Sequence, residues 1–415
     1  MEVKSYIYIF LYCFVFPFIY IFIHLNIPYL IFISFLIFTC AIITVQYIGL
    51  LKFKSNKIIP LGNKYNEITC IIVAYLPNEQ EQIFKTLEHF KNYTSNLKIN
   101  IIVAYNTNIP LPLIENKLNS YSSEKILILN ILNSKSKAEN INACLGLIET
   151  EIVCIFDTDS NPILGSLEIA LNNFNDNTVD IIQGHISIRN YDKNILTHIV
   201  ACEYDLIYSI YHKGFYNVYN YAIFGGSNGY FRTKILQTLK LNSDFLTEDI
   251  DLSFRSLILN YKCIYNDEII STELSPLSMD NYMKQRLRWS QGWFQVSKYY
   301  LFKILFSNLS FRYKLGTFFI LGWREFYFHI PFQLLGIICI YFYKNSYIEI
   351  NAFFSITCYS ILLFMIQLYI LKSNKKYWIL FIIPYQFLQI FIGLIGQFRE
   401  FNGYKKWNIT KREGI

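Results

Sequence analysis

The stretch Glu151-Ile-Val-Cys-Ile-Phe-Asp-Thr-Asp159 indicates the fold more directly than any other part of the sequence. Its first six residues are mostly β-branched or aromatic, which is typical of a buried strand. This strand runs directly into Asp157 and Asp159, whose side chains point the same way because they are two positions apart. Ligands of α/β sheets bind beyond the carboxyl ends of the strands, so we expect both carboxylates at the mouth of a binding site.

Strands and helices are predicted to alternate before this stretch. Apolar patterns predict three strands and two helices, namely strands at Ile68–Ala74, Ile99–Ala104 and Lys125–Leu132, and helices at Asn78–Tyr93 and Ala138–Glu149. Such alternation implies a parallel sheet covered by helices, and the fold class is therefore predicted to be α/β.

The composition disfavours an ordinary soluble enzyme. Of the 415 residues 53% are hydrophobic and 16% are charged, whereas soluble domains average ~25% charged residues. Residues 1–280 carry 20 Lys and Arg against 26 Asp and Glu, while residues 281–415 carry 17 against 4. An acidic region followed by a basic, apolar one suggests a catalytic region set against anionic lipids. Nucleic acid is not an expected partner, because the basic residues flank apolar runs instead of forming one stripe.

The spacing of the nine cysteines argues against a disulfide-bonded domain and against a zinc-binding domain. They are scattered along the chain without a CxxC pair, which fits neither a disulfide framework nor a zinc site. Buried thiols in a reducing compartment are the expected arrangement.

The N-terminal segment Ser5–Leu51 contains no charged residue and is long enough for two membrane-spanning helices of ~20 residues each. Lysines flank the segment on both sides, so the positive-inside rule places both of its ends, and the region that follows, in the cytoplasm. A buried helix pair in a soluble protein is the alternative, which the length of the apolar run disfavours.

Three more apolar runs lie near the C-terminus, at Phe326–Tyr343, Ile350–Leu371 and Tyr377–Phe398. The basic residues after the last run favour a cytoplasmic C-terminus, so we expect four spans with both termini in the cytoplasm. One run is then expected to be interfacial or re-entrant, and Pro384 makes the last run the candidate for a broken helix.

Asp157 and Asp159 also predict a metal site. Two unpaired carboxylates would repel each other, and hard cations such as Mg²⁺ and Mn²⁺ bind carboxylate oxygens together with substrate phosphates. An ordinary acidic loop after a strand is the alternative for a motif as short as Asp-x-Asp.

A second acidic motif lies in Phe245-Leu-Thr-Glu-Asp-Ile-Asp251. Asp249 is the candidate for a general base that takes a proton from an acceptor hydroxyl group, a role that contributes ~10²–10⁴-fold in rate. Alternatively, Thr247 caps a helix whose first turn favours the negative charges of Glu248 and Asp249. The sequence leaves both interpretations open.

The segment Gln285-Arg-Leu-Arg-Trp289 places Gln285, Arg288 and Trp289 on one face of a predicted helix. An arginine can bind a diphosphate in a bidentate manner, and a tryptophan offers a flat surface to a sugar ring. The alternative is an interfacial helix with arginines and tryptophans at the membrane boundary, and both interpretations can hold on opposite faces.

Two weaker signals accompany these motifs. Phe224-Gly-Gly-Ser-Asn-Gly-Tyr-Phe-Arg232 has three glycines in five positions, which allows a close approach of the backbone to a substrate, although a turn before a helix has the same composition. In Lys135-Ser-Lys-Ala-Glu-Asn-Ile-Asn142, Lys137 could reach a phosphate or a base, and a solvated loop lysine is the ordinary alternative.

The order of these motifs, K-A-x-N-I-N, D-x-D, G-G-S-N-G, T-E-D and Q-x-x-R-W followed by apolar runs, resembles that of the membrane-embedded family 2 glycosyltransferases. This group contains cellulose, hyaluronan, chitin and poly-N-acetylglucosamine synthases, and the likeness covers about residues 65–300. It implies a GT-A fold, which is a Rossmann-like α/β domain, flanked by transmembrane helices. It also implies an inverting hexosyltransferase that depends on Mg²⁺ or Mn²⁺ and usually takes a UDP-sugar donor.

The resemblance assigns donor-side roles to residues of three motifs. Asp159 would bind the metal, and Asp157 would share the metal or hold the nucleotide. Lys137 and Asn142 would lie near the nucleotide, and Arg288 would contact the diphosphate. An acidic pair that contacts the base in most relatives is replaced here by Tyr105-Asn-Thr107, which leaves the identity of the nucleotide open.

Acceptor-side roles follow from the same resemblance. Asp249 would be the catalytic base, with Glu248 beside it. Trp289 would contact the acceptor sugar and Gln285 would order the site. Gly226 and Ser227 would line the entrance for the acceptor.

The expected organisation has five parts: two transmembrane helices (1–54), a cytoplasmic GT-A domain (55–280), amphipathic interfacial helices with the Q-x-x-R-W motif (281–325), a membrane region of two to three spans (326–398) and a basic cytoplasmic tail (399–415). This predicts a multi-pass protein of the inner (plasma) membrane that contacts lipids. The leading hypothesis is a processive polysaccharide synthase that exports its glycan. The alternatives are transfer of one sugar to a lipid acceptor and a catalytically silent membrane scaffold.

Overall fold

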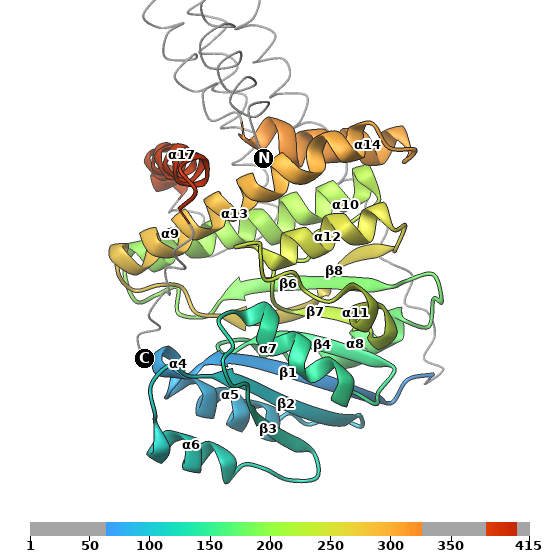
Figure 1. Cartoon of the computed structure of the whole chain (residues 1–415), viewed down its shortest axis with the longest axis vertical. Helices are drawn as coiled ribbons and strands as arrows, with labels where there is room; N and C mark the ends of the chain where they lie inside the picture. Colours follow the sequence, from blue (N-terminus) through green and yellow to red (C-terminus); the bar gives the residue numbers. More distant parts are fainter. Residues whose placement is uncertain (1–63, 326–378, 405–415) are drawn as a thin grey trace, which may run out of the picture. The chain divides into compact units, whose positions relative to one another are not determined.

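A mixed sheet of eight strands runs through the part of the chain that the computed structural model describes, residues 64–325 and 379–404 (Figure 1). The order across the sheet is β3-β2-β1-β4-β7-β6-β8-β5. Strands β1 to β4 are parallel, β7 is antiparallel to both of its neighbours, β8 is parallel to β6, and β5 is antiparallel to β8. The strands are β1 (Glu67–Tyr75), β2 (Lys98–Asn106), β3 (Ile126–Asn130), β4 (Ile152–Asp157), β5 (Asn161–Pro162), β6 (Ile181–Ile188), β7 (Gly229–Arg232) and β8 (Cys263–Glu273).

The α/β fold class and the four predicted strands are confirmed, because β1, β2, β3 and β4 form a parallel half-sheet. The expectation of a parallel sheet throughout is wrong for the other half, where β7 runs antiparallel between β4 and β6. The glycine-rich segment Phe224–Arg232 ends in this short strand, and α11 begins only after it, so the interpretation of its glycines as a turn directly before a helix is wrong.

Helices cover both faces of the sheet. The predicted helix at Asn78–Tyr93 is divided into α4 and α5, and the one at Ala138–Glu149 becomes α7 followed by a 3₁₀ turn at Leu145–Leu147. The α-helices are α4 (Leu76–Glu79), α5 (Gln82–Lys91), α6 (Pro112–Asn119), α7 (Lys137–Cys144), α8 (Ser166–Asn173), α9 (Ile195–Tyr204), α10 (Lys213–Tyr219), α11 (Thr233–Leu239), α12 (Glu248–Ile258), α13 (Met279–Leu305), α14 (Phe311–Thr317) and α17 (Ile379–Phe401). Two π-helical segments, Asp205–His212 and Phe318–Gly322, and a 3₁₀ turn, Trp323–Glu325, complete the described elements.

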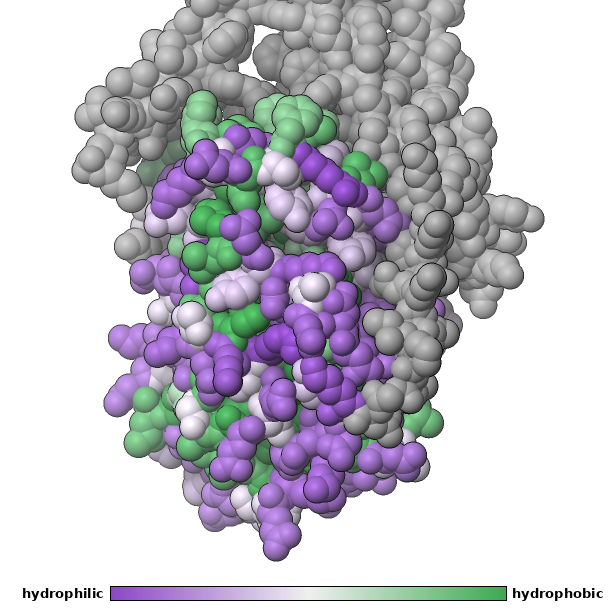
Figure 2. Space-filling view, turned by 90° about the vertical axis from the view of Figure 1, so that its right-hand side faces the viewer, coloured by the Kyte–Doolittle hydropathy of each residue, from purple (hydrophilic) through white to green (hydrophobic). Residues whose placement is uncertain are grey.

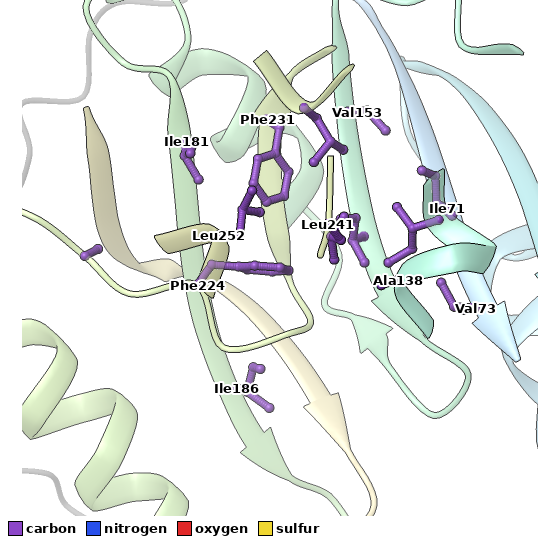
Figure 3. Close-up of a cluster of buried hydrophobic side chains, with 14 of the residues drawn as sticks. Ile71, Val73, Ala138, Val153, Ile181, Ile186, Phe224, Phe231, Leu241 and Leu252 are labelled. Carbon is purple, nitrogen blue, oxygen red and sulfur yellow. The ribbon is translucent and has the colours of Figure 1, made fainter. Parts of the chain in front are cut away.

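The alternation of side chains along the strands produces two cores, one on each face of the sheet. On β1, Ile71 and Val73 contribute to the core beneath α7, α9 and α12, whereas Cys70 and Ile72 contribute to the core beneath α5, α6 and α8. Figure 3 shows part of the first core, in which Ala138 of α7 lies near the strand residues. Because β1 and β4 are buried on both faces, their carboxyl ends are held in fixed positions.

One face of the described region is mainly hydrophilic, in contrast to the apolar cores. On the face drawn in Figure 2, hydrophilic residues predominate and apolar residues are interspersed among them. This is typical of a protein face in contact with water.

The C-terminal helix α17 corresponds to the apolar run Tyr377–Phe398. It is continuous over the position of Pro384, so the expected break in this helix is wrong. Among the residues described, none of the helices combines the length and the apolar character that a bilayer crossing requires. The predicted spans at Ser5–Leu51, Phe326–Tyr343 and Ile350–Leu371 lie outside the described residues.

Candidate active site

Three segments that are far apart in the sequence meet at the carboxyl end of β4. Asp157 is the last residue of this strand, and its backbone N–H donates a hydrogen bond to Ser227 Oγ over 3.2 Å. Lys137 begins α7, and its Nζ donates to the carboxylate of Asp157 and, over 2.6 Å, to the carbonyl of Gly226. The predicted residues Lys137, Asp157, Gly226 and Ser227 are therefore brought together.

Asp249 lies against the same turn. It is the second residue of α12, and its Oδ1 accepts a hydrogen bond from the backbone N–H of Ile250 over 2.9 Å. Gly226 has a φ of +91°, and a Cβ at this position would lie 2.8 Å from Asp249 Oδ2 and 3.7 Å from Lys137 Nζ. Only glycine combines this backbone conformation with so close an approach. We call Lys137, Asp157, Gly226 and Asp249 the strand-end cluster.

The positive charges near Asp249 do not compensate for its burial and for the negative charge of Glu248. Burial, and next the negative charge of Glu248, raise the pKa of Asp249 to about 7, while Lys137 and Arg288 oppose this shift. Burial disfavours the charged form of Lys137, but the carboxylates, Asp157 above all, outweigh it, so its pKa is raised. A carboxylate with a pKa near neutrality is suited to accept a proton at physiological pH.

The alternative interpretation of Thr247 as a helix cap is confirmed for its position, with Glu248 and Asp249 in the first turn of α12, but not for its side chain. Thr247 occupies the N-cap position of α12, yet its side chain makes no capping hydrogen bond. Its buried Oγ has no hydrogen-bond partner among the described residues and lies against Gly292 of α13, where a Cβ would come within 2.7 Å of it. Close packing against α13, and not capping, therefore fixes the start of the acidic motif.

Asp159 lies deeper in the fold than Asp157. It is fully buried, and its Oδ2 accepts a hydrogen bond from the backbone N–H of Leu274 over 3.1 Å. No set of three or more His, Cys, Asp or Glu side chains within residues 64–325 and 379–404 is placed to hold a metal ion. Mg²⁺ is usually bound by one or two carboxylates with substrate phosphates, so Asp157 and Asp159 fit such an ion by their chemistry.

The helix α13 carries the predicted residues of the Q-x-x-R-W motif. Arg288 Nη1 donates to the carbonyl of Leu246 over 3.2 Å, which places its charge beside the acidic motif and near Asp249. Gln285 is buried on the same helix. Trp289 is half-buried, and the guanidinium of Arg286 covers its ring at 4.5 Å from the centroid.

Asn142 has a different environment from the other predicted donor-side residues. Its amide nitrogen donates to the carbonyl of Leu241 over 2.8 Å, and its amide oxygen accepts from the N–H of Leu241 over 2.9 Å. The side chain thus fixes the loop before the acidic motif. A contact with the nucleotide remains a prediction for this residue.

Residues 152–392, more than half of the chain, match the family model Glycosyl transferase family group 2. The chain belongs to this family.

Among the relatives of this glycosyltransferase are two bacterial proteins of similar low identity. The probable glycosyltransferase YdaM of Bacillus subtilis is 23% identical over 379 residues, which cover 83% of this chain and 87% of YdaM. A hyaluronan synthase of Streptococcus pyogenes serotype M3 is 23% identical over 258 residues, which cover 59% of this chain and 61% of the synthase. The chain therefore matches less than two thirds of that synthase.

A solved structure supports the assignment of the fold. The mannosyltransferase PcManGT from Pyrobaculum calidifontis, in complex with GDP-Man and Mn²⁺, superposes with a TM-score of 0.59 at 14% identity, over 87% of this chain and 94% of that chain. The mixed sheet of this glycosyltransferase is accordingly a GT-A-like α/β fold.

Sequence reasoning missed several side chains that hold the site in place. Buried Gln183 of β6 accepts a hydrogen bond from the N–H of Gly225 over 2.8 Å and so fixes the glycine-rich turn. Glu203 of α9 accepts hydrogen bonds from Arg286 and from the hydroxyl of Tyr385 of α17. Arg286 stood inside a recognised motif, whereas no local pattern marked the other three.

Proposed function

We propose that this glycosyltransferase is an inverting, metal-dependent enzyme that moves a sugar from a nucleotide donor, a UDP-sugar, onto a growing polysaccharide. It would extend the glycan processively and export it, as a multi-pass protein of the inner membrane with a cytoplasmic catalytic domain. The observation that carries the proposal is the position of Asp249, a partly buried carboxylate with a pKa of about 7 beside the Gly226 turn.

In the proposed reaction, an acceptor hydroxyl oxygen attacks the anomeric carbon while the bond from that carbon to the nucleotide diphosphate breaks. The hydroxyl proton passes to the carboxylate of Asp249, and one displacement inverts the configuration. Arg288 and Lys137, whose charges both act on Asp249, would stabilise the negative charge of the departing diphosphate. A divalent cation bound by Asp157 and Asp159 would supply further electrostatic stabilisation of the same group.

Two similarities support the donor and the product. The hyaluronan synthase is a relative whose name states a polysaccharide product. PcManGT, which has the same fold, was solved with a nucleotide sugar and Mn²⁺ together. The base of the donor nucleotide is tested separately, because Asn106 stands where most relatives have an acidic residue that contacts the base. Its side chain is hydrogen-bonded to Ser134 and Asn140.

The proposal can be tested with the purified full-length protein in detergent. It is incubated with Mn²⁺ and, in turn, each common radiolabelled UDP-sugar and GDP-mannose, and the products are separated by size and by extraction into organic solvent. We expect high-molecular-weight product from one donor, and no product after chelation of the metal or in Asp249→Asn.

Other outcomes of this experiment have definite meanings. A small product that extracts into organic solvent would replace the polymer synthase with an enzyme that adds one sugar to a lipid. Full product formation in the presence of a chelator would contradict the metal dependence. A complete lack of product from every donor would reject the proposed function.

A further inference from the structure

We propose that Glu203, acting through Arg286, is a positioning residue for the indole ring of Trp289, and that Tyr385 of α17 completes this arrangement. The inference deepens the proposed function and rests on it in one respect, namely that Trp289 is taken to contact the acceptor sugar.

Glu203 and Arg286 form a bidentate ion pair between α9 and α13. Arg286 Nη1 donates to Glu203 Oε1 over 3.0 Å, and Arg286 Nη2 donates to Glu203 Oε2 over 2.6 Å. The side chains are only 6% and 17% exposed. Two parallel hydrogen bonds fix the plane of the guanidinium, which a single contact would not do. Because desolvation offsets the attraction in buried pairs, such a pair is better evidence for defined geometry than for stability.

The fixed guanidinium lies between two aromatic rings of its own helix. Its Cζ is 4.5 Å from the centroid of Trp289 and 5.2 Å from that of Tyr282. These residues lie at helical spacings of three and four from Arg286, so their side chains share one face of α13. The plane that Glu203 imposes on Arg286 therefore determines the orientation in which the Trp289 ring packs.

The helix α17, near the C-terminus, contacts both Glu203 and Tyr282. Tyr385 donates its hydroxyl hydrogen to Glu203 Oε2 over 2.7 Å, and its ring centroid is 5.7 Å from that of Tyr282. The amide of Gln389, one turn further along α17, donates to the hydroxyl of Tyr282. In Figure 1, α17 lies beside α13. We call Glu203, Arg286, Tyr282 and Tyr385 the α13–α17 contact.

The test uses the five tryptophans of the chain, labelled with 5-fluorotryptophan in the full-length protein in detergent. Trp289→Phe identifies the Trp289 resonance in the fluorine NMR spectrum. We expect Glu203→Gln to shift or broaden this resonance, since an amide cannot accept both guanidinium hydrogen bonds. Tyr385→Phe, which removes one hydroxyl group, should move it in the same direction by less.

Glu400→Gln is the matched control. Glu400 also joins α17 to α13, by accepting hydrogen bonds from Gln295 over 2.9 Å and from Lys298 over 3.0 Å, and it does not contact Arg286 or Trp289 in the described structure. This variant should leave the Trp289 resonance in place. If the Trp289 resonance moved equally in Glu203→Gln and Glu400→Gln, the Glu203–Arg286 pair would only hold the helices together and would not position the ring, which contradicts the proposal. An unmoved resonance in both Glu203→Gln and Tyr385→Phe would also overturn the proposal.

Kinetics with the donor and acceptor found for the wild type provide the second measurement. Glu203→Gln should raise the acceptor KM about tenfold with the donor KM little changed, because a displaced ring no longer orients the acceptor. A shifted resonance with an unchanged acceptor KM would confirm the positioning but reject the acceptor role of Trp289. If the wild type transfers no sugar, the proposed function fails, and the fluorine spectra alone decide whether Glu203 positions the ring.

Discussion

The strand-end cluster and the α13–α17 contact both contain charged side chains, but they differ in how completely their carboxylates are paired with positive charges. At the strand ends, Asp157 is paired with Lys137, whereas Asp249 has the negative Glu248 as its neighbour and a pKa raised to about 7. In the α13–α17 contact, Glu203 is fully paired with one arginine. An unbalanced carboxylate is poised for proton transfer, whereas a balanced pair is suited to hold neighbouring groups in place. The proposed roles, proton transfer at Asp249 and positioning at Glu203, follow from this difference.

The largest expected effect comes from a substitution in the strand-end cluster that leaves the α13–α17 contact unchanged. Asp249→Asn should lower the rate of transfer ~10²–10⁴-fold, since the amide cannot accept the acceptor proton. The raised pKa means that ionisation of Asp249 destabilises the fold as pH rises from about 4 towards 7. The variant should therefore be at least as stable as the wild type at pH 8, as measured by Tm in detergent.

Asp251, on the same helix, is the matched control for this variant. It is fully buried and bound by Arg255 Nε and by the hydroxyl of Tyr300, each over 2.7 Å. Asp251→Asn should lower stability by ~1–3 kcal/mol and leave the rate of the folded protein largely intact. If both variants lost the same rate with the same drop in Tm, Asp249 would be a structural residue as well.

A second prediction sharpens the account of the helix pair. A Cβ at Gly396 of α17 would lie 2.9 Å from the backbone nitrogen of Gln291 in α13, so the two helices must move apart to accommodate it. Gly396→Ala should destabilise the protein by ~1–3 kcal/mol. Gly146→Ala should be neutral or slightly stabilising, because a Cβ at this position would meet no other residue within 4 Å apart from its chain neighbours. Equal Tm values for the two variants would show that α17 does not depend on close contact with α13.

The two regions also differ in how far the sequence predicted them. The residues of the strand-end cluster lie in short motifs, and the pattern of the buried strand was enough to predict that Asp157 lies at its carboxyl end, where ligands of such sheets bind. The contacts of Glu203 join residues 83 and 182 positions apart, and no local pattern marks such pairs. The strands β5 to β8 were also not predicted, and for β7 the reason is its length, because four residues are too few for periodicity to reveal a strand.

The third prediction has the smallest expected effect and tests the electrostatic side of the comparison. The pH dependence of kcat/KM reports the pKa values of the free enzyme, so its acid limb should lie near pH 7, below which Asp249 is protonated. Glu248→Gln should move this limb to lower pH, because the neighbouring negative charge raises the pKa of Asp249. Lys298→Gln, which removes a charge from the ion pair with Glu400, should leave the limb where it is. An acid limb that does not move in Glu248→Gln would assign the observed pKa to a group other than Asp249, and the distinction between a reactive and a balanced region would then fail at its central residue.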